Sequence, residues 1–228
     1  LDGTKQVEHF FDDILAHTEL WANHLQILRD IFLRVRKANL TLKPSKCYFG
    51  NNSIGFLGHS ISSEGLVPEK EKIQRINNMV PPKDKKSLLS FLGCLGYHRK
   101  FIPNYSMIVK PLTDLTQKKR NFEWGEAQQS AFEQLKNLLN KEPILLWPDV
   151  SKDFYVQTDA SGIGIGAVLL QLQNGVKHPV MYASRKLTVC ESHYSTIELE
   201  LLAILFGIQK FAIYLYGKKL LKLLIRIN

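Results

Sequence analysis

The stretch Phe-Phe-Asp-Asp-Ile-Leu at residues 10–15 places two adjacent carboxylates, Asp12 and Asp13, inside an otherwise apolar run. Strand-forming residues on both sides of the acidic pair predict a tight hairpin with the pair at its tip. Burial of two neighbouring like charges is costly unless a cation neutralises them. Lys and Arg are absent from Gln6 to Leu28, so the cation that fits is a divalent metal with oxygen ligands, such as Mg²⁺. A solvated turn explains the pair at least as well on local grounds, because Asp is common in turns.

The bulk composition is that of a soluble globular protein. The chain has 228 residues, of which 45% are hydrophobic and 22% charged, enough for one large domain or a few small ones. It contains neither a long apolar run nor a signal peptide, so we expect no membrane span. It begins at Leu1, which suggests a fragment or a processed piece. The three cysteines, Cys47, Cys94 and Cys190, fit neither a disulfide framework nor a zinc spacing and indicate reduced thiols in an intracellular protein.

The net charge of +9 is concentrated in the middle of the chain. Residues 66–141 carry 14 basic and 7 acidic side chains, a net charge of +7. Residues 1–65 carry 7 of each kind, and residues 142–228 carry 9 basic and 7 acidic. A basic centre between two carboxylate-bearing flanks suggests a polyanion bound by the centre and processed at the ends. A generic solvated Lys-rich surface accounts for the charge equally well.

The first third of the chain predicts one helix and several short strands. Thr18 can cap a helix whose apolar residues recur at helical spacing as far as Val35. Residues 40–42 and 54–61 read as short strands separated by turn residues. Gly55 and Gly58 suggest a backbone that bends there or is closely approached.

Residues 68–141 have a helical pattern, punctuated by prolines. Ser87 precedes one amphipathic run and is expected to start a helix, and a second helix is expected from Ala127 to Leu139. Pro143 and Trp147-Pro148 mark a boundary. Beyond it, strands are expected at 154–158, 162–172 and 180–183, followed by a long helix from about Thr196 to Leu215. Three successive strands followed by a helix define a small α/β unit.

A second pair of carboxylates is predicted in this unit. Asp159 ends the first strand and precedes a glycine-rich run at residues 162–166. A dinucleotide-binding loop would have to open a helix, whereas this run continues as strand, so the glycines fit better as a turn and a flexible strand. Glu198 has capping-box spacing from Ser195, which gives it a structural role. Glu200 lies about 200° around the helix from Glu198 and is free to face Asp159.

Several short motifs occur here in the order in which a known family has them. Together they resemble the Pol polyprotein of gypsy-type LTR retrotransposons, in its reverse transcriptase and RNase H regions, nearly end to end. The motifs are the aromatic-x-Asp-Asp box at 10–15, Phe-Leu-Gly-His at 56–59, a thumb and connection signature at 92–102, Phe-Glu-Trp at 122–124, Thr-Asp-Ala-Ser at 158–161, Tyr-Ala-Ser-Arg at 182–185, Tyr-Ser-Thr at 194–196 and Glu-Leu-Leu-Ala-Ile at 200–204.

The resemblance implies a mixed α/β (α+β) fold with three parts. Residues 1–65 would form hairpins of a partial reverse-transcriptase palm, residues 66–147 a helical thumb/connection, and residues 148–228 a truncated RNase H-like domain. Within the palm, Asp12 and Asp13 would hold catalytic Mg²⁺, with Mn²⁺ as the alternative metal. Asp159 and Glu200 would be metal ligands of the RNase H site. Both sites would use two-metal phosphoryl chemistry.

The resemblance also implies nucleic-acid partners. An RNA–DNA hybrid and a primer–template duplex would be gripped by the hairpin motif and by the thumb, through phosphate contacts that carry no sequence information. The remainder of the Pol polyprotein would be a protein partner, and dNTP would bind only together with the upstream palm and fingers. No membrane would be involved. The chain would act in the cytoplasm, the nucleus or virus-like particles. The expected contact residues are Phe56, Leu57, Gly58, His59, Arg99 and Lys100.

Two departures from the family pattern limit the expected activity. The family has a further metal-binding Asp upstream of the aromatic-x-Asp-Asp box, and this chain begins after it. The family also has a Thr-Asp-His motif after the long helix, whereas no Asp follows Asp159 here. The 228-residue chain alone is therefore expected to lack polymerase activity and to have at most feeble RNase H activity.

Three interpretations follow from the sequence. The chain is a fragment of a retroelement reverse transcriptase with an RNase H domain, or a catalytically inactive, retrotransposon-derived nucleic-acid-binding protein. An unrelated regulatory or scaffold domain is the third. Salt-dependent binding to an RNA–DNA hybrid separates the first two interpretations from the third.

Overall fold

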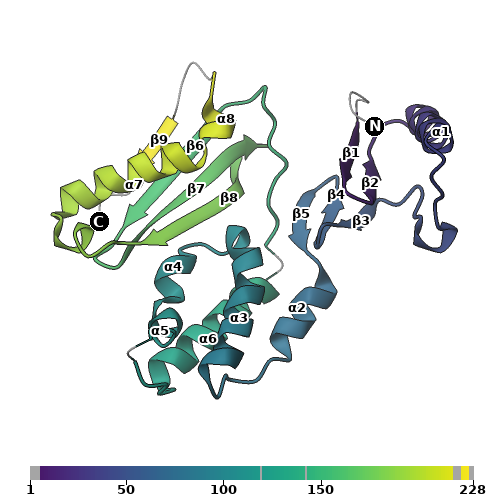
Figure 1. Ribbon diagram of the computed structural model, residues 1–228. Coiled ribbons are helices and arrows are strands. Elements are labelled where there is room, and N and C mark those ends of the chain that lie inside the picture. Colours follow the sequence, from purple (N-terminus) through teal and green to yellow (C-terminus); the bar gives the residue numbers. More distant parts are fainter. Residues whose placement is uncertain (1–5, 119, 142, 218–221, 226–228) are drawn as a thin grey trace. The chain divides into compact units, whose positions relative to one another are not determined.

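The computed structural model describes residues 6–118, 120–141, 143–217 and 222–225 (Figure 1). The fold is a mixture of helices and strands, as the sequence predicted. The chain divides into two compact units, Leu1–Leu57 and Gly58–Asn228. The predicted parts 66–147 and 148–228 both lie in the second unit, and the three-part division itself stays a prediction.

The first unit contains the predicted hairpin. Strands β1 (Val7–Phe10) and β2 (Asp13–Ala16) pair antiparallel, with Phe10 opposite Asp13. Helix α1 (Trp21–Lys37) buries Ile31 and Val35 against Val7 of β1. The hairpin therefore has a small apolar core on one side and a tip that carries the acidic pair.

Two sequence predictions in this unit are wrong. Helix α1 begins at Trp21 after Leu20, so Thr18 is too far upstream to cap it, and the Thr18 hydroxyl lies 3.2 Å from Nδ1 of His24 instead. Residues 40–42 form no strand. Leu40 is 64% exposed, and a short apolar run does not form a strand without a neighbouring strand to receive its hydrogen bonds. A short 3₁₀ turn, η1 (Pro44–Lys46), follows this run, and β3 (Ser53–Phe56) comes later.

The second unit begins with a hairpin and continues with helices. Strands β4 (His59–Ser62) and β5 (Gly65–Pro68) pair antiparallel. The predicted strand at 54–61 is broken at residues 57 and 58, because one strand ends at Phe56 and β4 begins at His59. The buried core of the helical part is formed by Leu88, Phe91, Leu95, Phe101, Leu112, Phe132, Leu135 and Leu139. The helices are α2 (Lys70–Asn77), α3 (Lys85–His98), η2 (Arg99–Phe101), α4 (Tyr105–Ile108), α5 (Lys110–Asp114) and α6 (Glu126–Asn140).

The helix predicted to start at Ser87 starts earlier. Asp84 is its N-cap, and its side chain accepts a 2.7 Å hydrogen bond from the Ser87 backbone N–H. Ser87 completes the capping box by accepting from the Asp84 backbone N–H at 3.2 Å. The Ser87 backbone N–H and the Ser87 hydroxyl, which both donate to the Asp84 carboxylate, hold the pKa of Asp84 below its usual range. The helix predicted at 127–139 is confirmed as α6.

A four-stranded sheet forms the rest of the unit, in the order β8-β7-β6-β9. The antiparallel strands are β6 (Phe154–Ala160), β7 (Gly164–Gln173) and β8 (Val176–Lys186), and β9 (Lys222–Ile225) runs parallel to β6. The predicted strand at 180–183 is thus longer, and the one at 162–172 begins two residues later. The helix predicted at 196–215 is interrupted at the fully buried Phe211, giving α7 (Thr196–Lys210) and α8 (Ala212–Leu215).

The two faces of the sheet are covered by different parts of the unit. Successive residues of a strand point to opposite faces. Ala167 of β7 faces α7, because a Cβ on Gly207 of that helix would lie 3.2 Å from the Ala167 Cβ. Gly164 and Gly166 face the other way, toward α4. The sheet therefore lies between α7 and the segment that contains α4.

Buried hydrogen bonds join the helical part to the sheet. The Ser106 backbone N–H in α4 donates to Oγ of Ser184 in β8 at 2.9 Å, and the two hydroxyls are 3.1 Å apart. Arg99 donates to the Ser184 carbonyl at 2.7 Å. Lys186 forms a 3.1 Å ion pair with Asp114 at the end of α5. These contacts explain why residues on both sides of 147 form one compact unit.

No helix among the described residues is long and apolar enough to cross a membrane.

Candidate functional site

The acidic pair lies at the tip of the first hairpin. Phe11 and Asp12 form the two-residue turn, and Asp13 is the first residue of β2. Phe11 has a φ of 51° and is 90% exposed, which is an unusual backbone conformation for an aromatic residue. Both carboxylates are exposed. Desolvation therefore does not by itself demand a cation at this tip, and the metal-binding role of Asp12 and Asp13 stays a prediction.

The predicted nucleic-acid-binding hairpin motif forms a tight turn. Leu57 and Gly58 both have positive φ values, 47° and 71°, as a two-residue type I′ turn requires. Gly58 is also closely approached, because a Cβ there would collide with the Lys72 ammonium group and lie 3.2 Å from the Tyr97 ring. Phe56 precedes the turn and is half-buried. Glycine thus suits the backbone conformation at position 58, and it lies close to the side chains of Lys72 and Tyr97.

His59, which follows the turn, is buried rather than displayed. It is 7% exposed, and its Nδ1 lies 3.4 Å from the Tyr97 hydroxyl. Its ring also packs against Phe101, with the ring centroids 5.6 Å apart. In this structure His59 fixes the turn to the end of α3.

His98 lies beside this aromatic cluster at the end of α3. It is 2% exposed, and its Nδ1 accepts or donates no hydrogen bond among the described residues. Burial, then the neighbouring His59, Lys72 and Lys100, lower the pKa of His98 to about 4. His98 is therefore a neutral core residue at physiological pH.

Arg99 and Lys100 also have structural partners. The Arg99 guanidinium donates to the Ser184 carbonyl and lies 5.7 Å from the centre of the Tyr105 ring. The Lys100 ammonium lies 5.4 Å from the centre of the Phe101 ring, and burial lowers its pKa. The structure thus ties Arg99 to β8 and packs Lys100 against Phe101, and the contact of both residues with nucleic acid stays a prediction.

Asp159 and Glu200 are brought together by the second unit. Asp159 lies one residue before the end of β6, and the described part of β9 pairs only with Tyr155–Thr158 of that strand. Glu200 lies in the second turn of α7. Burial raises the pKa of Glu200, and the charge of Asp159 raises it further. The two carboxyl groups therefore interact electrostatically, and their joint role as metal ligands stays a prediction.

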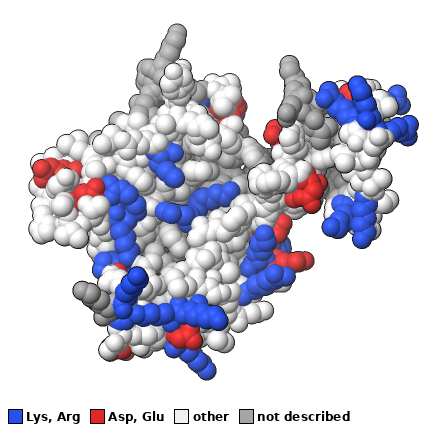
Figure 2. Space-filling view, viewed as in Figure 1, with Lys and Arg blue, Asp and Glu red and all other residues white. Residues whose placement is uncertain are grey.

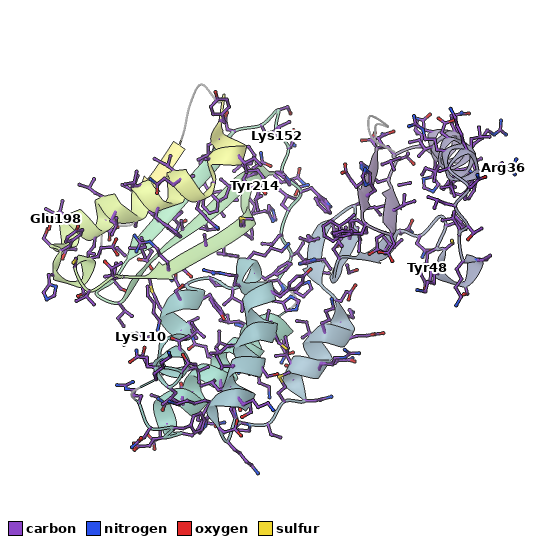
Figure 3. All side chains as sticks on the ribbon, viewed as in Figure 1. Arg36, Tyr48, Lys110, Lys152, Glu198 and Tyr214 are labelled. Carbon is purple, nitrogen blue, oxygen red and sulfur yellow. The ribbon has the colours of Figure 1, made fainter. Side chains whose placement is uncertain are left out.

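The two glutamates of α7 have different environments. Glu198 completes the predicted capping box at the start of the helix (Figure 3), accepting 2.7 Å hydrogen bonds from the backbone N–H and the hydroxyl of Ser195. These hydrogen bonds lower the pKa of Glu198. Oε2 of Glu200, by contrast, is buried and has no hydrogen-bond partner among the described residues. A buried carboxylate oxygen without a donor is the arrangement that a cation would satisfy.

Among the described residues, this candidate site has two carboxyl groups, those of Asp159 and Glu200. Within the described ranges, no three His, Cys, Asp or Glu side chains are grouped so as to hold a metal ion. Asp159 and Glu200 can therefore supply part of a ligand set of the oxygen donors that Mg²⁺ prefers. The family motif that would supply another Asp is not in this sequence.

The glycine-rich run has a role that the sequence did not predict. Gly164 and Gly166 lie within β7, in the strand that the sequence predicted, and both are buried. A Cβ on Gly166 would collide with the side-chain oxygen of Asn104, whereas a Cβ on Gly164 would lie 2.8 Å from the Arg185 carbonyl oxygen of β8. Gly166 thus allows α4 to approach the sheet closely, and Gly164 makes room for the neighbouring strand. Asn104 was missed because nothing in its local sequence points to a strand 55 residues away.

Basic side chains gather on the helical part of the second unit. Figure 2 shows lysines and arginines over the helices, with few acidic groups among them. Lys110, at the start of α5 (Figure 3), pairs with Asp114 at 3.1 Å. Asp114 also pairs with Lys186 and, at 3.9 Å, with Arg120. A single carboxylate among three cations leaves a local excess of positive charge.

The sequence of this chain is similar to sequences of known proteins. Residues 124–221 match the family described as "RNase H-like domain found in reverse transcriptase". The retrovirus-related Pol polyprotein from transposon 297 of Drosophila melanogaster is 39% identical over 213 residues, covering 93% of this chain. The transposon Tf2-3 polyprotein of Schizosaccharomyces pombe is 35% identical over 207 residues, covering 90%. The chain spans 20% and 16% of the lengths of these two relatives.

Solved structures of a viral enzyme are also similar. The foamy viral protease-reverse transcriptase in complex with RNA/DNA hybrid has a TM-score of 0.82 and 28% sequence identity, covering 97% of this chain and 30% of the viral chain. The complex of the same enzyme with dsDNA has a TM-score of 0.85 and 27% identity, covering 100% of this chain and 48% of the viral chain.

Proposed function

We propose that this chain, which is homologous to the retrovirus-related Pol polyproteins of transposons, hydrolyses RNA in RNA–DNA hybrids. The proposal starts from its match to the RNase H-like domain found in reverse transcriptase. The observation that carries the proposal is the interaction between Asp159 and Glu200, in which Oε2 of Glu200 is buried without a donor. Such a pair is unfavourable in the free protein and is relieved by a bound cation.

Asp159 and Glu200 would hold the metal, Mg²⁺ or Mn²⁺. When bound, a pair of such ions activates the attacking water and stabilises the leaving oxygen of a phosphodiester. The chain's own contribution is to place two oxygen ligands from different elements, the end of β6 and the second turn of α7. The antiparallel pairing of β6 with β7, in which Asp159 lies opposite Gly166, keeps the Asp159 backbone in place.

The helical part would bind the nucleic acid. Its excess of positive charge suits the phosphate backbone of a duplex, and the similar viral enzyme has been solved with an RNA/DNA hybrid and with dsDNA. The hybrid would be recognised by its shape and its 2′-hydroxyl groups rather than by sequence. The remainder of the Pol polyprotein would complete the assembly inside the cell.

Asp12 and Asp13 would contribute to a polymerase site. Their place at the tip of the β1–β2 hairpin puts two carboxylates side by side in solvent, where a metal can reach them. There they would hold metal for attack by a primer 3′-hydroxyl. Phe56, Leu57, Gly58 and His59 would support the primer as a rigid turn.

A binding protein without catalysis is the second candidate. It is favoured by the finding that the described residues bring together only two carboxyl groups at the Asp159 site. The helical part would then bind the hybrid while the sheet acts as a scaffold.

Hybrid binding and cleavage by the 228-residue chain separate these functions. We expect binding that weakens between 50 and 200 mM salt, with slow cleavage supported by Mn²⁺ or Mg²⁺. Asp159→Asn and Glu200→Gln should abolish cleavage of the hybrid without affecting its binding. The control Glu198→Gln should retain both cleavage and binding. Binding without cleavage in either metal supports the second candidate. Absence of hybrid binding contradicts both.

A further inference from the structure

Asn104 makes an unexpected hydrogen bond across the junction of helices and sheet. It precedes α4, and its side chain does not cap that helix. Instead, its Nδ2 donates to Oδ2 of Asp159 at 3.3 Å. Asn104 lies outside residues 124–221, the part that matches the RNase H-like domain. The carboxylate of the sheet therefore has a partner from the helical part of the chain.

The backbone of Asn104 is held in an uncommon conformation. Its φ of 49° and ψ of 30° are in the left-handed region, which Asn tolerates better than most residues. The Asn104 carbonyl still accepts from Met107 at 2.9 Å, so the following helix starts normally. This conformation directs the amide away from the helix and toward the sheet. Strain of this kind is commonly retained where it positions a side chain.

Contacts on both sides fix the position of Asn104. Downstream, the Ser106 backbone N–H is bonded to the buried hydroxyl of Ser184. In the sheet, Gly166 of β7 pairs directly with Asp159 of β6. Gly166 leaves room for the Asn104 side chain, which a Cβ on residue 166 would displace. The amide therefore lies over the pair formed by Gly166 and Asp159.

We propose that Asn104 is a positioning residue for Asp159. Its hydrogen bond engages one carboxylate oxygen and thereby orients the other for a cation, and the inference rests on the proposed nuclease function. A neutral amide can orient a carboxylate without neutralising it, whereas Lys or Arg would compete with the cation. The RNase H-like sheet thus depends on the helical part for the geometry of its own ligand.

A glycine substitution tests this role without introducing strain. Asn104→Gly removes the amide and keeps the left-handed backbone. The matched control is Asn174→Gly, which makes the same change at an exposed residue with a φ of 53° in the turn between β7 and β8. Thermal unfolding of both variants checks that the fold is retained.

Two readouts are measured by NMR on the 228-residue chain. Without metal, the side-chain NH₂ signals of Asn104 are identified by their loss in Asn104→Gly, and we expect them to move in Asp159→Asn. On titration with Mg²⁺, we expect Asn104→Gly to bind about 10-fold more weakly than the wild type, the usual effect of removing a partner of a metal ligand. Asn174→Gly should bind as the wild type does.

The outcomes distinguish the two proposals. Unchanged Asn104 signals in Asp159→Asn, or equal Mg²⁺ affinity in Asn104→Gly and the wild type, would overturn the role of Asn104. If Mg²⁺ does not bind the wild type at all, the nuclease proposal fails, and the metal-free signals alone decide whether Asn104 orients Asp159.

Discussion

Oδ1 of Asn104 occupies the space in which a Cβ at Gly166 would lie. Gly166 is in the middle of a regular antiparallel pairing with Asp159, and its φ is not in the left-handed region. It is therefore glycine for reasons of space. The close approach of α4 to the sheet depends on this one missing side chain.

Gly166→Ala should destabilise the protein by about 1–3 kcal/mol, because the added methyl group displaces Asn104 in a packed junction. Gly162→Ala is the control, since a Cβ there meets nothing within 4 Å. Urea unfolding measures the free energy of unfolding of both variants. Adding Asn104→Gly to Gly166→Ala should recover most of the loss, and a purely additive double variant would contradict direct contact.

Glu200→Gln should raise the melting temperature of the metal-free protein at pH 7, by roughly 1–2 °C for a chain of this size. The reason is that burial and the charge of Asp159 disfavour the ionised Glu200 carboxyl. Glu198→Gln should lower the melting temperature or leave it unchanged, because the ionised Glu198 is stabilised by Ser195. Thermal scans in EDTA test the contrast, and a shift of the same sign in both variants would count against it.

His98 should make the protein less stable as the pH falls from about 6.5 to about 4. The folded protein holds His98 neutral, whereas the unfolded chain binds a proton throughout this window, so each step down in pH favours unfolding. The full effect is at most about 3 kcal/mol. Unfolding free energies at several pH values should show the dependence in the wild type and a reduced one in His98→Phe. Equal slopes would show that His98 is not the group responsible.

Phe11→Gly should stabilise the first hairpin by up to about 1 kcal/mol, because glycine adopts a positive φ without the steric cost that an aromatic residue carries. The Phe11 side chain is 90% exposed, and the packing that the substitution removes is its edge-to-face contact with the Phe10 ring, whose centroid is 4.8 Å away. Hydrogen exchange of the β1 and β2 amides measures the change. Phe10→Gly should have the opposite effect, because Phe10 lies within β1. Destabilisation by Phe11→Gly would mean that the ring makes contacts that outweigh the strain.

Local sequence alone determined much of this protein. Strand-forming residues on both sides of Asp12 and Asp13 predicted the hairpin, and the spacing of Ser195 and Glu198 predicted the start of α7, because both depend on neighbours a few residues apart. The order of the motifs identified the family without any knowledge of the fold. The same local reasoning misplaced the start of α3, where Asp84 rather than Ser87 is the N-cap residue.

Only the tertiary structure decided what surrounds the expected site residues. It turned His59 inward and gave Arg99 a partner in β8, and it put Asn104 against Asp159. Each of these depends on contacts between segments that are distant along the chain. Packing and burial set those contacts, and no pattern of neighbouring residues encodes them. The sequence therefore identified Asp159 and Glu200 as candidate ligands, and the packing of α4 on the sheet decided how Asp159 is held.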